Sequence, residues 1–240
     1  MKMKEFTGYC YDDYAAEMGY KRIKNAYHKL IGTDVLLSFG LGRYGCNQCV
    51  RPVMGIAPLY GNLMWEKEFE GSFDSRGAYY NHTGIWMDTY QSAKDSMEET
   101  EKLRAYLRDI FEQAQQPFLL VAKDLQTAYD AYNARFNYIC NGNMPEYSVE
   151  KNNISFLLVL KKYDETLRNF DLWVADRSEP LPETSRYAQL RRQLQEKNYD
   201  AIQNYLEEVK KENIKKLRQE KLLPGCVEGT VLLTHFKERK

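Results

Sequence analysis

The chain has 240 residues, of which 43% are hydrophobic and 28% are charged, and these proportions exclude a fibrous or largely disordered protein. Its 34 basic residues balance its 34 acidic residues, so no long-range field draws the whole molecule to nucleic acid or to an anionic membrane. Binding of either kind would need a local patch. This length suits one large domain or two modest ones.

The N-terminal residues lack the apolar core of a signal peptide, and the longest apolar run, FLLVL at 156–160, is too short to cross a bilayer. The five cysteines are odd in number and mostly scattered, which does not suit a disulfide framework. We therefore expect a cytoplasmic protein without a membrane segment.

In the first third of the chain, Asp12 and Asp13 can cap a helix that carries apolar residues from 14 to 31 and ends at Gly32. Short apolar segments follow at 35–39 and 53–57, separated by glycine and proline turn signals. These segments predict strands, and the whole region reads as a small sheet with loops.

Helical periodicity dominates after residue 88. Stripes of apolar residues predict helices over 90–114, 118–139, 156–174, 187–194 and 201–217, and Pro117 separates the first two. The segment 229–236 reads as a strand that could return to the first sheet. The fold class is therefore predicted as helix-rich α+β, with a small N-terminal sheet packed on a multi-helix bundle. The expected regions are 1–87 and 88–240, which one integrated domain could unite, and we detect no internal repeat.

The stretch DVLLSFGLGRYGCNQCVRP contains Gly40, Gly42 and Gly45 in the pattern G-x-G-x-x-G. A dinucleotide site requires a strand, these glycines and then a helix whose N-terminus faces the phosphates. Pro52 and the residues after it interrupt the helix that would follow. We interpret the three glycines as a bend after a strand, and a nucleotide site at them as the alternative.

Cys46 and Cys49 form C-x-x-C, which can contribute two thiolates to a zinc site but needs two further ligands. His82 and Cys10 are the plausible completions. A dithiol redox pair is a second possibility, although it prefers a helix N-terminus. We expect two unrelated thiols and no cofactor, with zinc as the alternative.

Residues 13–30 partly resemble a helix-turn-helix, because Lys21, Arg22 and Lys24 open what would be its second helix. The apolar residue that should pack this helix on the first is missing near Asn25. Nucleic-acid binding through these three basic residues is therefore an alternative to the main interpretation.

Tyrosine is in excess, with 19 residues, and phenol rings suit interfaces because they combine a large apolar body with a polar tip. No catalytic motif survives inspection. The sequence thus favours a non-enzymatic protein that binds another macromolecule, most simply a protein, as an adaptor or an inhibitor would. An enzyme or ligand-binding protein with a nucleotide or zinc site in residues 34–52 is the alternative. The candidate contact residues are the tyrosines of the first region: Tyr9, Tyr11, Tyr44, Tyr60, Tyr79 and Tyr80.

Overall fold

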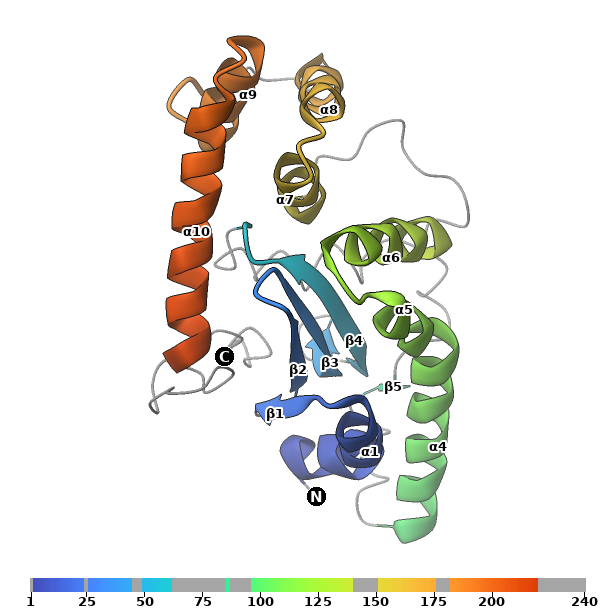
Figure 1. Ribbon diagram of the computed structural model, residues 1–240. Coiled ribbons are helices and arrows are strands. Elements are labelled where there is room, and N and C mark those ends of the chain that lie inside the picture. The colour runs from blue at the N-terminus through green and yellow to red at the C-terminus, as the bar shows by residue number, and fades with distance from the viewer. Residues whose placement is uncertain are drawn as a thin grey trace.

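The computed structural model describes residues 2–23, 26–44, 49–61, 85–86, 96–139, 151–175 and 182–219. In these ranges eight helices accompany one antiparallel sheet with the strand order β1-β2-β3-β4-β5. Figure 1 shows the sheet at the centre, with α4, α5 and α6 on one side and α10 on the other. The predicted helix-rich α+β class is confirmed.

The first helix, α1, spans Met3–Met18, and Gly19 ends it in the left-handed conformation, with φ 73°. The chain then forms β1 (Lys21–Ile23) and β2 (Ala26–Ile31). The expectation of a helix up to residue 31 was wrong, because the apolar residues of this segment fit the alternating faces of a strand as well as one helical face. The helix-turn-helix interpretation is corrected with it.

Strands β3 (Val35–Tyr44) and β4 (Cys49–Pro58) pair in register from Val35 opposite Pro58 to Tyr44 opposite Cys49, and β5 (Ile85–Trp86) joins β4. The two predicted strands are confirmed. Gly40 and Gly42 occupy ladder positions inside β3, so the expected bend does not begin at them.

The remaining helices follow the predicted order, with two additional breaks. One falls at 122–124, where Asp124 accepts a hydrogen bond from the backbone of Thr127 and so caps the next helix. The other falls at 160–162. The bounds are α4 Met97–Ala114, α5 Gln116–Val121, α6 Leu125–Ile139, α7 Lys151–Val159, α8 Tyr163–Ala175, α9 Arg186–Gln195 and α10 Tyr199–Gln219.

The two faces of the sheet carry cores of different size. Alternate residues of β3, from Val35 to Leu41, enter a first cluster with α1, α4, α6 and α7, where Phe39 lies 4.7 Å from Phe111 between ring centroids. The opposite face contributes Leu36 to a small third cluster, which includes Leu217 of α10. A second cluster lies among α7, α8, α9 and α10. The first cluster therefore joins both sides of the predicted boundary at residue 87.

The hairpins α7–α8 and α9–α10 have turns of the same geometry, and we refer to them as two copies of one hairpin. Both turns hold a lysine in the left-handed conformation, Lys161 at φ 58° and Lys197 at φ 55°. Their capping hydrogen bonds have the same pattern and lengths. The equivalent pairs are Lys161 to Leu158 and Lys197 to Leu194, both 3.1 Å, and Lys162 to Leu157 and Asn198 to Gln193, both 2.8 Å.

The two copies close on each other rather than stacking in a row. Tyr163 and Tyr199, which occupy the same position in the two copies, stack at 4.1 Å with an angle of 6° between their rings. Helix α8 packs against α9, and α10 packs against α7, contacts that exchange when the two hairpins are swapped. Each hairpin therefore contacts the other through both of its helices. The equivalent buried pairs are Ile154 and Leu190, Leu158 and Leu194, and Phe170 and Leu206.

Candidate interaction surface

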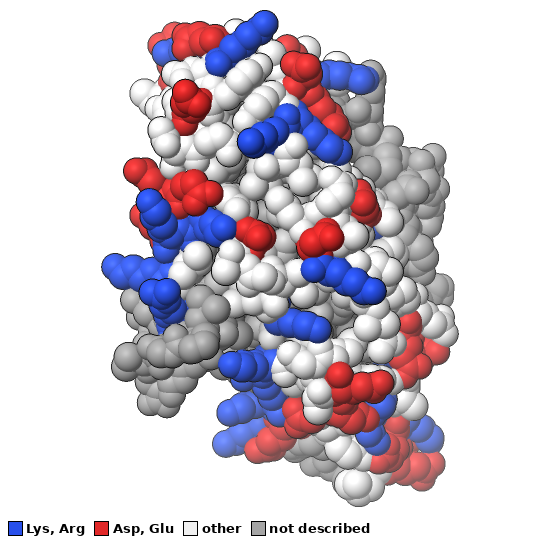
Figure 2. Space-filling model, viewed as in Figure 1, with Lys and Arg blue, Asp and Glu red and all other residues white. Residues whose placement is uncertain are grey.

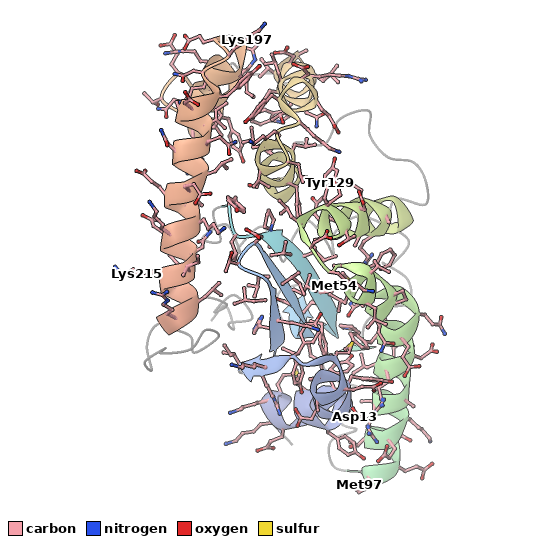
Figure 3. All side chains as sticks on the ribbon, in the orientation of Figure 1. Asp13, Met54, Met97, Tyr129, Lys197 and Lys215 are labelled. Carbon is pink, nitrogen blue, oxygen red and sulfur yellow. The ribbon has the colours of Figure 1, made fainter. Side chains whose placement is uncertain are left out.

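Two arginines of α4 lie over two tyrosines of α1. The guanidinium carbon of Arg104 is 4.6 Å from the ring centroid of Tyr9, and that of Arg108 is 4.2 Å from Tyr14. Arg108 also forms an ion pair with Asp13 at 2.8 Å and donates a hydrogen bond to the Tyr14 hydroxyl at 3.2 Å. In Figure 3, Asp13 lies between the two helices. We call these five residues the α1–α4 seam.

The sequence creates this seam through helical spacing. Arg104 and Arg108 are one turn apart on α4, and Tyr9 and Tyr14 lie on the matching face of α1. Ser96 caps the start of α4 by accepting a hydrogen bond from the backbone of Glu99 at 3.4 Å. A guanidinium held over a ring is pre-organised for a further polar contact, because little side-chain freedom remains to be lost.

The large apolar side chains that are strongly exposed among the described residues all lie on α4 and α5. Leu120 and Val121 are adjacent and each 53% exposed, while Tyr106 is 40% and Met97 71% exposed. Helix α5 starts at a proline-containing turn and is apolar on every side, but only Leu119 is buried. A helix of this composition is usually covered on all sides.

The seam and α5 are neighbours. The side chain of Gln116, the first residue of α5, lies 3.9 Å from the sulfur of Met18 at the end of α1. Figure 1 shows α5 at the end of α4, next to α6. Together they form one candidate surface with tyrosine and arginine on one part and exposed aliphatic side chains on the other.

The predicted contact tyrosines do not share one surface. Tyr9 lies half-buried in the seam, and Tyr11 is buried behind it, with its hydroxyl 3.2 Å from the Leu107 carbonyl oxygen to which it donates. Burial raises the pKa of the Tyr11 phenol far above its usual range. Tyr60 is also buried, at the far side of the sheet. For Tyr11 and Tyr60 the expected exposure is corrected, because their rings complete the core.

The other predicted tyrosines fall outside this description. Tyr44 is the last residue of β3, and the structure does not describe its side chain. Tyr79 and Tyr80 lie outside the described residues. A role for these three in partner binding stays a prediction.

The glycine and cysteine stretch becomes part of the β3–β4 ladder. Gly40 pairs with Val53, Gly42 pairs with Arg51, and Cys49 opens β4 opposite Trp86. Residues 49–58, where a dinucleotide fold would place a helix, form an antiparallel strand instead, so no helix follows these glycines in this part of the described chain. Gly45 lies outside the described residues.

The proposed metal ligands are described only in part. Cys46 and His82 lie outside the described residues, so zinc binding by Cys46, Cys49 and His82 stays a prediction. Cys10, the other proposed completion, is buried in the first cluster, and burial raises the pKa of its thiol to about 12. Across the described ranges, no three His, Cys, Asp or Glu side chains gather where they could hold a metal ion.

His28 on β2 is buried and faces Ser38 on β3, with its Nδ1 atom 2.9 Å from the Ser38 hydroxyl oxygen. Burial lowers the pKa of this imidazole to about 3, so it is neutral at physiological pH. A nucleophilic site would also need a group that orients the ring and donors for an oxyanion. In the described part of the chain the Nε2 atom has no hydrogen-bond partner, so the pair lacks the orienting group.

The basic residues proposed for nucleic acid are separated by their strand. Lys21 is exposed on β1, whereas Arg22 forms an ion pair with Asp12 at 3.2 Å and donates to the backbone oxygen of Lys4. Lys24 lies outside the described residues. The two described residues therefore do not begin a recognition helix.

A charged contact fixes α10 to the sheet and was not predicted. The ammonium nitrogen of Lys210 lies 2.8 Å from Asp34 Oδ1 and 2.8 Å from the Tyr60 hydroxyl, which itself donates to Asp34 Oδ1 at 2.7 Å. Asn213 donates to the backbone oxygen of Leu59 at 2.7 Å. Burial alone would raise the pKa of Asp34, but the hydrogen bonds from Lys210 and Tyr60 outweigh it and lower the pKa. These groups satisfy one another, which indicates a structural role.

Comparisons with protein-family models, with curated proteins and with solved structures find no match to this chain. None of the helices within the described ranges has the length and apolar composition of a membrane-spanning segment.

Sequence reasoning missed the seam because Arg104 and Arg108 lie on a helix whose polar residues were all assigned to solvent. Two arginines four residues apart on α4 could have suggested contacts with the tyrosines of α1. That suggestion requires knowing that α1 packs against α4, which the sequence does not show. Val121 was assigned to the apolar stripe of a predicted helix over 118–139, and the exposure of Leu120 was not predicted. The break at 122–124 makes α5 a separate short helix, on which both side chains are exposed.

Proposed function

We propose that this protein binds a partner protein through α5 and the neighbouring α1–α4 seam and has no chemistry of its own. The observation that carries the proposal is the exposure of Leu120 and Val121 side by side, each 53% exposed. Covering the exposed half of these two side chains contributes about 2 kcal/mol of apolar burial. The half-buried tyrosines and arginines of the seam match the residue types that dominate binding energy in protein interfaces.

A cytoplasmic setting is part of the proposal. It is supported by the odd number of scattered cysteines and by the buried free thiol of Cys10. Tyr9 is the predicted contact residue retained in the proposed surface.

The test compares three proteins in affinity capture from cells that express the chain, followed by quantitative mass spectrometry. The wild type and a Lys123→Gln control should retain the same specific protein, because Lys123 is exposed beside α5 but is not apolar. The double variant Leu120→Lys/Val121→Lys should lose it by at least about tenfold, since the apolar contact is replaced by charge. Circular dichroism confirms that all three are folded. Equal capture by the double variant contradicts the proposal.

A substitution in the seam tests its second part. Arg104→Ala should weaken binding of the captured partner by about tenfold, and Arg104→Lys should not restore it, because an ammonium group lacks the planar fork of the guanidinium. Isothermal titration with the purified partner measures both. Affinities equal to that of the wild type would exclude the seam from the interface.

A further inference from the structure

The second half of α10 is basic. From residue 210 to residue 218 it carries five basic residues and one acidic residue, Glu212, whereas its first half contains Asp200, Glu207 and Glu208. Figure 2 shows blue side chains gathered along the lower part of α10, at the left edge of the molecule. The protein as a whole has no net charge, so this is a local feature.

Four of these basic side chains have no acidic partner among the described residues. Some basic residues elsewhere in the described ranges form ion pairs, as Arg191 does with Asp171 at 2.7 Å and Arg108 with Asp13 at 2.8 Å, whereas others, such as Lys123 and Lys197, form none in those ranges. Lys210 is committed to Asp34 at 2.8 Å. The four side chains without an ion pair in that part of the chain are Lys211, Lys215, Lys216 and Arg218.

Three of the four form one exposed row. Lys211, Lys215 and Arg218 follow the spacing i, i+4 and i+7, which places them on one side of the helix over roughly 10 Å. We call these three residues the basic stripe. In Figure 3, Lys215 points away from the sheet at the left of the molecule.

The stripe rests on a fixed helix. Leu217 is buried in the third cluster, Ile214 packs against that cluster, and Asn213 is clamped to the backbone after β4. Favourable interaction with the helix dipole is limited to the last turn, so it accounts for Arg218 but not for Lys211. An array of unpaired charges held in place at helical spacing is suited to a polyanion.

The surroundings of the basic stripe favour one polyanion over others. The apolar face of α10 is already packed on the sheet, so this helix cannot insert that face into a lipid bilayer. In the described second half of α10, no large apolar side chain is strongly exposed, and a dry core for a protein interface is therefore absent there. A phosphate backbone needs neither, because basic side chains alone supply non-specific binding.

We propose that the basic stripe binds the phosphate backbone of nucleic acid without sequence preference. The recognised groups are phosphates, since Lys and Arg at a helix surface contact them without reading bases. The site is distinct from the surface proposed for a partner protein.

The test measures fluorescence anisotropy of a labelled mixed-sequence DNA duplex of about 20 base pairs in a series of salt concentrations. Wild-type affinity should fall with salt with a logarithmic slope of about −2.7, as three phosphate contacts imply. The variant Lys211→Gln/Lys215→Gln/Arg218→Gln should bind at least about tenfold more weakly and have a slope near zero.

A matched control carries the same charge change on exposed residues elsewhere. Lys123→Gln/Arg192→Gln/Lys197→Gln replaces two lysines and one arginine and should retain wild-type affinity and slope. Equal weakening by both triple variants overturns the proposal, since net charge would then explain binding. Absence of duplex binding by the wild type at about 50 mM salt also overturns it. So does tighter, stripe-dependent binding to phosphatidylserine vesicles or to polyglutamate than to the duplex.

Discussion

The two copies of the helical hairpin differ mainly in how they attach to the sheet. In α7–α8 the first helix makes the attachment, because Phe156 and Leu157 of α7 are buried in the first cluster. In α9–α10 the equivalent residues are Arg192 and Gln193, which that cluster does not include. There the attachment is made by the second half of α10, which continues well beyond the end of α8.

This difference distinguishes two kinds of buried residue that have the same apolar spacing in the sequence. Residues that hold each hairpin closed recur in both copies, as Leu158 and Leu194 do. Residues that attach a hairpin to the sheet occur in one copy only. Residues that recur in both hairpins therefore hold each hairpin closed. Residues that occur in only one hairpin attach that hairpin to the sheet.

The largest expected effect tests the attachment of α7. Phe156→Ala should lower the free energy of unfolding by about 4 kcal/mol, because it removes a fully buried ring. Arg192→Ala, at the equivalent exposed position, should change it by less than about 0.5 kcal/mol. Urea denaturation measures both. Similar costs at the two positions would contradict the assignment of Phe156 as an attachment residue.

The attachment of α10 predicts a smaller effect. Asn213→Ala removes a buried amide that donates to the backbone oxygens of Leu59 and Gly61, at 2.7 and 2.5 Å. Two carbonyl groups lose their partner, so the expected loss is about 2 kcal/mol in the same urea experiment. Hydrogen exchange should then increase in the second half of α10 before it does in α9. Unchanged exchange in α10 would show that its packing alone holds it.

A pH dependence follows from the ion pair between Asp34 and Lys210. Because the folded pKa of Asp34 is below its ordinary value of 3.8, the pair stabilises the fold above that pH, and its contribution is lost as pH falls through the folded pKa. Asp34 is 37% exposed, so solvent screening limits the contribution to about 1 kcal/mol. Wild type should exceed Asp34→Asn in stability at pH 7, and the difference should vanish at acid pH. A difference that persists below about pH 2 would contradict this account.

The smallest effect tests the equivalence of the two turns. Lys161→Gly and Lys197→Gly should each stabilise the protein by up to about 1 kcal/mol, because glycine adopts a positive φ without the strain that a side chain causes. Their φ values differ by only a few degrees, so the two gains should be alike. Differential scanning calorimetry of the single variants compares them. Opposite signs would show that the two turns are not equivalent in solution.

The sequence predicted the parts of the fold that depend on local pattern. Strands at 35–39 and 53–57 and the order of the later helices were correct because apolar spacing and proline breaks determine them, whereas the breaks inside 118–139 and 156–174 were not predicted. The segment 20–31 was misassigned, since Tyr27, Leu30 and Ile31 fit both a helix and a strand, and pairing with β3 decides between them. The similar geometry of the two turns was not predicted, because capping hydrogen bonds appear only in the fold.

The candidate surfaces depend still more on tertiary packing. Tyr9 and Tyr11 are two residues apart, yet one reaches the seam and the other completes the core, where Phe39 and Phe111 surround it. Helical spacing places them on different sides of α1, but which side the core covers depends on how α1 packs against β3 and α4. Lys211 and Lys215 stand out in the sequence as basic residues, but only the structure shows that they form no ion pair among the described residues, although Glu207 and Glu212 lie at helical spacing from them.

Helix α10 supplies Ile202 and Leu206 to the second cluster and Leu217 to the third, so a single rigid element crosses from the hairpin pair to the sheet. If either cluster unfolds, α10 is held less firmly, and the other cluster is destabilised as well. Heating should therefore produce one cooperative heat-capacity peak, with equal calorimetric and van't Hoff enthalpies, despite the difference in character between the two halves of the chain.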